Sequence, residues 1–137
     1  MTAQEISNIL DQQRKFFLSG ETLPVKFRKT MLKKLYASIV SHKEEILSAL
    51  TSDLGKSDFE GFMCEVGLTL TEISYMIKKV AKFAKEKTVV TPMAQFASRS
   101  YKKPCPYGNT LIMSPWNYPF LLTIEPLANA IAAGNTA

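Results

Sequence analysis

The stretch Ser114-Pro115-Trp116-Asn117-Tyr118-Pro119-Phe120 decides how the C-terminal part of the chain folds. It separates the apolar run Asn109-Thr110-Leu111-Ile112-Met113, which is typical of a buried strand, from a helical pattern that begins at Pro119. Its prolines and aromatic residues restrict the shape of the loop. In open α/β sheets, ligands bind beyond the carboxyl ends of strands, next to helix N-termini. This loop is therefore the strongest candidate for a binding site.

Asn117 carries the polar group in this loop that best suits catalysis. Its side-chain amide is a neutral hydrogen-bond donor that can stabilise a developing oxyanion. An Asx turn packed between aromatic side chains explains the same residues without any chemistry. The residues by themselves leave both interpretations open.

The helix predicted after the loop ends at Gly134, where a left-handed cap is favoured, and Pro126 is expected to kink it. A strand followed by a helix is half of a βαβ unit, whose second strand would begin at Asn135-Thr136-Ala137. We therefore expect the chain to be an N-terminal piece of a longer protein. The apolar side chains left partly exposed by the incomplete sheet should be those of Leu111, Met113, Leu127 and Ile131.

The upstream sequence predicts helices. Thr2 and Glu5 have the spacing of a capping box before a helix that ends at Ser19-Gly20. A second, longer helix is predicted from Pro24 to Leu50, and a third carries apolar positions from Phe62 to Ala84. From Thr88 the residues become β-branched, and residues 99–103 and 109–113 are predicted to be the two strands of a hairpin.

Composition places the chain among folded globular proteins. Of its 137 residues, 46% are hydrophobic and 21% are charged, which excludes a disordered tail, collagen or a mucin-like stalk. The N-terminus lacks the pattern of a signal peptide, and the apolar run 120–124 is too short to cross a bilayer. The two cysteines form no disulfide framework, which indicates a reducing compartment. We expect a cytoplasmic protein without a membrane span in this segment.

The net charge of +5 is compatible with an anionic partner. A cluster of lysines near the end of the third helix is best interpreted as a solvated helix end (Lys78, Lys79, Lys82, Lys85 and Lys87). The alternative is a basic helical interaction module in which these lysines and Lys26, Lys29, Lys33 and Lys34 bind nucleic acid or acidic lipid. Its affinity for polyanions would fall steeply as salt rises.

Other reactive residues are given structural interpretations. Gly55-Lys56-Ser57 imitates the end of a P-loop, but Leu50 replaces the required glycine, so a helix-ending turn is predicted. His42 is the only histidine, and we expect no metal site. Cys64 is predicted to pack within a helix, and Cys105 lies between prolines without a nearby base, so neither is a good nucleophile.

Two groups of motifs carry a family resemblance over nearly the whole chain. Pro115-Trp116-Asn117-Tyr118-Pro119, followed by Pro126-Leu127 and Ala130-Ile131-Ala132-Ala133-Gly134-Asn135, resembles the aldehyde dehydrogenase superfamily around its asparagine. Asp53-Leu54-Gly55-Lys56-Ser57, with Phe62 and Glu65-Val66-Gly67, is similar to the branch that includes the dimeric class 3 and fatty aldehyde dehydrogenases.

The resemblance implies an enzyme that uses NAD or NADP to oxidise a small-molecule aldehyde to a carboxylic acid through a cysteine thioester. Asn117 corresponds to the catalytic asparagine that holds the oxyanion. The segment that lies against the cofactor corresponds to Met113, Ser114, Pro115, Trp116 and Asn117. The family's nucleophile and general base would lie beyond Ala137, so the fragment itself is expected to be inactive.

The resemblance also implies an α/β fold. N-terminal helices and a β-hairpin would lead into the first strand and helix of a Rossmann-type dinucleotide-binding domain. We expect a helical segment over residues 1–92 and the hairpin with the start of that incomplete domain over residues 93–137. The chain has no G-x-G-x-x-G motif, which agrees with this family's unusual use of the Rossmann fold. The intact enzyme is expected to be a homodimer that does not bind nucleic acid.

Overall fold

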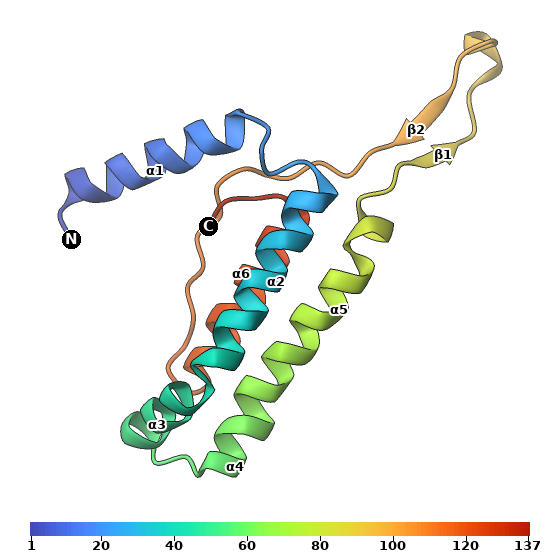
Figure 1. Ribbon diagram of the computed structural model, residues 1–137. Coiled ribbons are helices and arrows are strands. Elements are labelled where there is room, and N and C mark those ends of the chain that lie inside the picture. Colours follow the sequence, from blue (N-terminus) through green and yellow to red (C-terminus); the bar gives the residue numbers. More distant parts are fainter.

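Helices make up most of the structure, a computed structural model that describes residues 1–137 (Figure 1). The helices are α1 (Ala3–Leu18), α2 (Val25–Ser41), α3 (Lys43–Leu54), α4 (Asp58–Gly61), α5 (Gly67–Phe83) and α6 (Pro119–Ala133). A π-helical turn (Phe62–Val66) joins α4 to α5, and a short 3₁₀ turn spans Met93–Gln95. The strands β1 (Lys87–Val89) and β2 (Ser100–Lys102) form a two-stranded antiparallel sheet. The predicted α/β character is therefore present only in part.

The predicted capping box at the start of α1 is confirmed. The Thr2 hydroxyl accepts a hydrogen bond from the Glu5 amide at 3.3 Å, and the Glu5 carboxylate accepts one from the Thr2 amide at 2.7 Å. None of the residues of α1 is buried, and the helix lies apart from the helix bundle (Figure 1). The Phe16 ring contacts that of Phe27 on α2, with the centroids 6.0 Å apart.

The prediction of one helix from Pro24 to Leu50 is wrong, because the helix breaks at His42. This residue has φ −106° and ψ 17°, outside helical geometry, and α3 continues in a different direction (Figure 1). The Ser41 hydroxyl donates to the Ser38 carbonyl at 2.9 Å, and His42 Nδ1 lies 2.8 Å from the same oxygen. Side chains that compete for backbone groups in this way favour a helix end. The His42 side chain is exposed to solvent.

The third predicted helix is confirmed in position, with a π-helical turn that the periodicity did not reveal. The Gly67 amide donates to the Phe62 carbonyl, five residues back, which widens one turn of the helix. A Cβ atom at Gly67 would lie 2.9 Å from that carbonyl oxygen. The wider turn brings Glu65 and Val66, consecutive in sequence, both into the interior.

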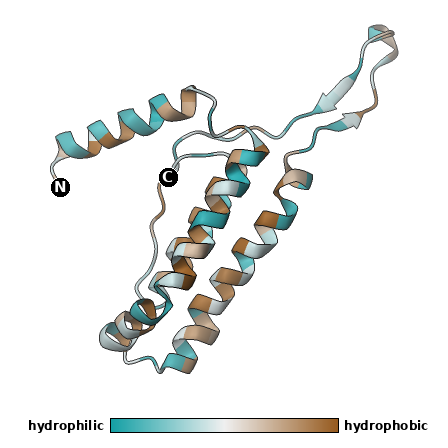
Figure 2. Cartoon of the chain, in the orientation of Figure 1, coloured by the Kyte–Doolittle hydropathy of each residue, from teal (hydrophilic) through white to brown (hydrophobic).

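The core lies where α2, α5 and α6 pack against one another. Figure 2 shows apolar residues along α2 and α5. The buried core consists of Leu32, Ile39, Leu47, Val66, Ile73, Val80, Ala128 and Ala132. Because α6 is in contact with both α2 and α5, its N-terminus and the loop before it are held against the rest of the bundle.

The predicted hairpin is wrong in its pairing. Residues 100–102 pair with residues 87–89, with Thr88 opposite Tyr101, and not with residues 109–113. The β-branched residues near Thr88 provide a better partner for β2. The hairpin therefore has one strand on each side of residues 92 and 93, where the boundary between the helical segment and the second domain is expected.

Residues 109–113 are extended but form no regular strand. Leu111 and Met113 are exposed, whereas Leu127 and Ile131 are half-buried, as expected for a strand without its sheet neighbours. One parallel bridge joins Asn109 to Thr136, just after α6. Its position is where the βαβ interpretation predicts the second parallel strand.

Arg28, on α2, joins the turn between α1 and α2 to the end of α6. Its guanidinium donates to the carbonyls of Thr22 at 2.9 Å, Leu23 at 2.7 Å and Ala132 at 3.3 Å. Burial lowers the pKa of this group. The predicted left-handed cap at Gly134 is confirmed, with φ +92°, and a Cβ atom there would lie 2.8 Å from Arg28 Cζ.

Replacing Gly134 should therefore cost more stability than replacing Gly55, which also ends a helix in left-handed geometry. Gly134→Ala combines the left-handed penalty with displacement of a bonded guanidinium, for about 2–4 kcal/mol. At Gly55, with φ +66° and no atom within 4 Å of an added Cβ, only the penalty of about 1–2 kcal/mol applies. Urea denaturation of both variants measures the difference. Equal losses would contradict the role given to the Arg28 contact.

Candidate active site

The site begins at the turn that ends α3. Gly55 adopts the left-handed conformation, and the Thr51 hydroxyl donates to the Lys56 carbonyl at 2.7 Å. The predicted helix-ending turn is thus confirmed. The turn directs the Lys56 side chain into the protein, and the residue is only 8% exposed. The sequence analysis did not predict this burial.

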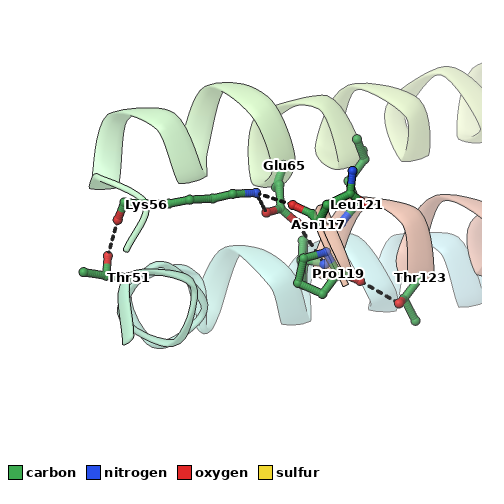
Figure 3. A network of polar contacts seen from close by, with 8 residues as sticks. Thr51, Lys56, Glu65, Asn117, Pro119, Leu121 and Thr123 are labelled. Atoms are coloured by element: carbon green, nitrogen blue, oxygen red, sulfur yellow. Dashed lines mark hydrogen bonds and ion pairs between the residues drawn. The ribbon is translucent and has the colours of Figure 1, made fainter. Parts of the chain in front are cut away.

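The Lys56 ammonium group lies between three partners, two of which, the Glu65 carboxylate and the Asn117 carbonyl, are drawn in Figure 3. It donates to Glu65 Oε1 at 2.5 Å and to the backbone carbonyl of Asn117 at 2.9 Å. The ring centroid of Tyr118 lies 4.0 Å from the nitrogen, within the range of a cation–π interaction. A buried ammonium group is costly unless its charge and its hydrogen-bond donors are satisfied. Here a carboxylate, a carbonyl and an aromatic face satisfy them.

The Glu65 side chain is fully buried and caps α6 from a distance. Its Oε2 atom accepts hydrogen bonds from the amides of Phe120 at 2.9 Å and Leu121 at 3.2 Å. These amides belong to the first turn of α6, which has no N-cap side chain of its own. The negative charge also suits the positive end of the helix dipole. The carboxylate thus joins the π-helical turn to the start of α6.

The five residues predicted to form the site lie together in one exposed segment before α6. The side chains of Met113, Ser114, Pro115, Trp116 and Asn117 are all on the surface. Ser114 Oγ lies 2.6 Å from the hydroxyl of Thr123, which itself donates to the Pro119 carbonyl at 2.6 Å. The loop is therefore tied to α6 on its upstream side. The Asn117 amide forms no hydrogen bond within the chain and faces solvent.

Lys56 and Glu65 are the residues that sequence reasoning missed. The sequence feature that could have revealed them is the position of Glu65, a carboxylate next to the apolar positions Phe62 and Val66 of the same helix. A charged residue that is fully buried needs a partner of opposite charge, and Lys56 is nine residues away. The family motifs included both residues, but they did not show what the side chains contact.

The remaining reactive side chains stay outside this network. Cys105 is exposed, and its thiol donates to the Lys103 carbonyl at 3.7 Å, whereas Cys64 is half-buried in the π-helical turn. No group of three or more His, Cys, Asp or Glu side chains is arranged to hold a metal ion. The lysines in the cluster near the end of α5 are all exposed to solvent.

Comparison with known proteins decides the family. The model of the "Aldehyde dehydrogenase family" matches residues 1–137, the whole chain. The chain belongs to the aldehyde dehydrogenase family. It is 46% identical over 134 residues to the 4,4'-diaponeurosporen-aldehyde dehydrogenase of Staphylococcus aureus (strain NCTC 8325 / PS 47), covering 95% of this chain and 29% of the relative.

Two further relatives support the resemblance to class 3 aldehyde dehydrogenases. The dimeric NADP-preferring aldehyde dehydrogenase of Canis lupus familiaris is 41% identical over 132 residues, covering 96% of this chain and 29% of the relative. The solved structure titled "Substrate bound state of Staphylococcus Aureus AldH" superposes with a TM-score of 0.91 at 44% identity. It covers 100% of this chain and 30% of that one.

The chain therefore spans about 30% of the length of these aldehyde dehydrogenases. No helix in the structure has both the length and the apolar character needed to cross a membrane. The helical bundle and the short hairpin of this aldehyde dehydrogenase segment match that part of a solved family structure.

Removing the Glu65 carboxylate should destabilise the protein strongly. Glu65→Ala leaves the Lys56 ammonium group buried without its counter-charge and two α6 amides without an acceptor, for a loss of about 3–5 kcal/mol. Glu60→Ala is the control, because Glu60 is exposed on neighbouring α4 and should change stability by less than about 0.5 kcal/mol. Denaturant titration measures both variants. A similar small loss for Glu65→Ala would show that the network does not stabilise the fold.

Proposed function

We propose that residues 1–137 are the N-terminal part of an NAD- or NADP-dependent aldehyde dehydrogenase that oxidises an aldehyde to a carboxylic acid through a cysteine thioester. The family match over the whole chain and the coverage of about 30% of its relatives support this proposal. The nucleophilic cysteine and the general base would belong to the rest of the enzyme. In keeping with this, neither Cys64 nor Cys105 has a base among its hydrogen-bond partners.

Asn117 is the catalytic residue of this proposal. When a thiolate attacks the aldehyde carbonyl, negative charge develops on the carbonyl oxygen, and the Asn117 amide donates a hydrogen bond to that oxygen. The observation that carries this role is the contrast between its two polar groups. The backbone carbonyl is bound by Lys56 at 2.9 Å, whereas the side-chain amide is exposed and uses no donor within the chain.

The segment Met113, Ser114, Pro115, Trp116 and Asn117 is proposed to lie against the cofactor, whose nicotinamide accepts the hydride when bound. The exposed apolar side chains of Met113, Pro115 and Trp116 fit a flat ring. The first amides of α6 already bind Glu65, so they do not serve a pyrophosphate. This agrees with the lack of a G-x-G-x-x-G motif in the chain.

The larger architecture follows from the same proposal. The dinucleotide-binding domain of Rossmann type begins within residues 93–137, and the parallel bridge between Asn109 and Thr136 supports this placement. Residues 1–92 are the helical segment that precedes it. The intact enzyme is proposed to be a homodimer acting on a small-molecule aldehyde, since one relative carries the description "dimeric NADP-preferring".

The test of Asn117 uses the full-length enzyme. Asn117→Ala should lower kcat by ~10² to 10³, which corresponds to about 2.7–4 kcal/mol of transition-state stabilisation, because the donor acts where charge develops. Asn117→Asp should be at least as harmful, since it places a carboxylate beside the developing negative charge. Steady-state kinetics with an aldehyde and NAD or NADP give kcat, and cofactor affinity should change little.

His42→Ala is the matched control for these measurements, because His42 is exposed at the junction of α2 and α3, and it should behave like the wild type. If Asn117→Ala keeps a near-normal kcat and only loses thermal stability, Asn117 is a turn-forming residue. The oxyanion role would then be abandoned.

A further inference from the structure

The contacts of Lys56 hold the backbone on the downstream side of Asn117. The carbonyl that Lys56 binds belongs to the peptide between Asn117 and Tyr118, so this hydrogen bond fixes the plane of that peptide. Glu65, paired with Lys56, fixes the amides of Phe120 and Leu121 a few residues later (Figure 3). The backbone that leaves Asn117 is therefore determined by two buried charged side chains.

Lys56 itself has no route to a substrate. The residue is 8% exposed, and its ammonium group is already engaged with the Glu65 carboxylate, the Asn117 carbonyl and the Tyr118 ring. Any effect of Lys56 on the chemistry must act through the residues that it contacts. Of these, Asn117 is the one with an exposed side chain that can donate to a reacting atom.

Fold stability alone gives a poor reason for burying this ion pair. Removing two charges from water is costly, and well-packed apolar side chains of similar volume often stabilise a protein equally well or better. A lysine that donates to a carbonyl makes a directional hydrogen bond to one particular peptide group, which an apolar side chain cannot make. That peptide adjoins the residue proposed to donate to the oxyanion.

We propose that Lys56, held by Glu65, is a positioning residue that orients Asn117 for oxyanion stabilisation by binding its backbone carbonyl. The inference rests on the proposed function of Asn117. Lys56 sets the direction in which the Asn117 Cα–Cβ bond leaves the loop, and the Ser114–Thr123 contact holds the loop upstream. The side-chain amide then reaches the oxyanion without first having to order the backbone.

A double-mutant cycle in the full-length enzyme tests this. Lys56→Met should lower kcat by ~10- to 100-fold, because small misplacements of a catalytic group are costly, while KM for the aldehyde changes by less than about threefold. In an Asn117→Ala background, the same substitution should lower kcat by less than about twofold, since there is no donor left to orient. A merely structural lysine would not give this dependence.

Lys43→Met is the matched control. Lys43 is a surface lysine that pairs with Glu44 at 3.0 Å and lies 5.7 Å from the ring centroid of Phe62, and its loss should leave kcat unchanged in both backgrounds. The melting temperature of each variant is measured in parallel, so that loss of folded enzyme is separated from loss of turnover.

The outcomes separate the two proposals. If Asn117→Ala does not lower kcat, the proposed function of Asn117 fails, and the positioning role fails with it. If Asn117→Ala lowers kcat but Lys56→Met has no effect, or has the same effect in both backgrounds, only the positioning role is overturned. Where Lys56→Met does not fold, Lys56→Arg keeps the charge beside Glu65 and alters the contact to the carbonyl. In that case the double-mutant cycle uses Lys56→Arg, and the positioning role is overturned if this variant lowers kcat equally with and without Asn117→Ala, or not at all.

Discussion

The fully buried carboxylate of Glu65 joins the π-helical turn that carries it to the turn after α3, nine residues earlier, and to the start of α6, 55 residues later. One oxygen binds Lys56 from the turn after α3, and the other accepts the first two available amides of α6. Since α6 begins at Pro119, its entry is set by these contacts, and so is the loop that carries Asn117. The rest of the site depends on this one side chain, because no local residue caps the helix.

The opposite end of α6 follows the same physical rule with the charges reversed. Arg28 donates to the Ala132 carbonyl in the last turn, next to the left-handed Gly134, so that a buried cation meets the negative end of the helix dipole. A buried anion and a buried cation from two other helices thus bracket an apolar helix. This fixes the position of α6 along its axis, which apolar contacts alone specify poorly.

Local signals in the sequence predicted the parts of the fold that depend on neighbouring residues. The Thr2–Glu5 capping box, the turn at Gly55 and the cap at Gly134 each need only a few adjacent positions, and all three are present. The break at His42 was hidden because the apolar period continues across it. The predicted pairing of the hairpin was wrong because strand pairing depends on tertiary partners. The true partner of β2, around Thr88, is on the other side of β2 in sequence from the proline-containing turn that suggested the hairpin. For the site, the role of the loop 113–117 stays a prediction, and the sequence did not reveal the Lys56–Glu65 pair, since only the fold brings those side chains to the loop.

The most direct measurement of the central claim is hydrogen–deuterium exchange at the start of α6 in the full-length enzyme, comparing wild type with Glu65→Gln. Replacing the carboxylate by a neutral amide weakens the acceptor of the Phe120 and Leu121 amides. A loss of about 1.4 kcal/mol of protection corresponds to tenfold faster exchange. The account predicts at least that acceleration in a peptide covering residues 118–124, with α1 unchanged. Unchanged exchange at residues 118–124 would contradict the claim that Glu65 holds the start of α6 and, through it, the Asn117 loop.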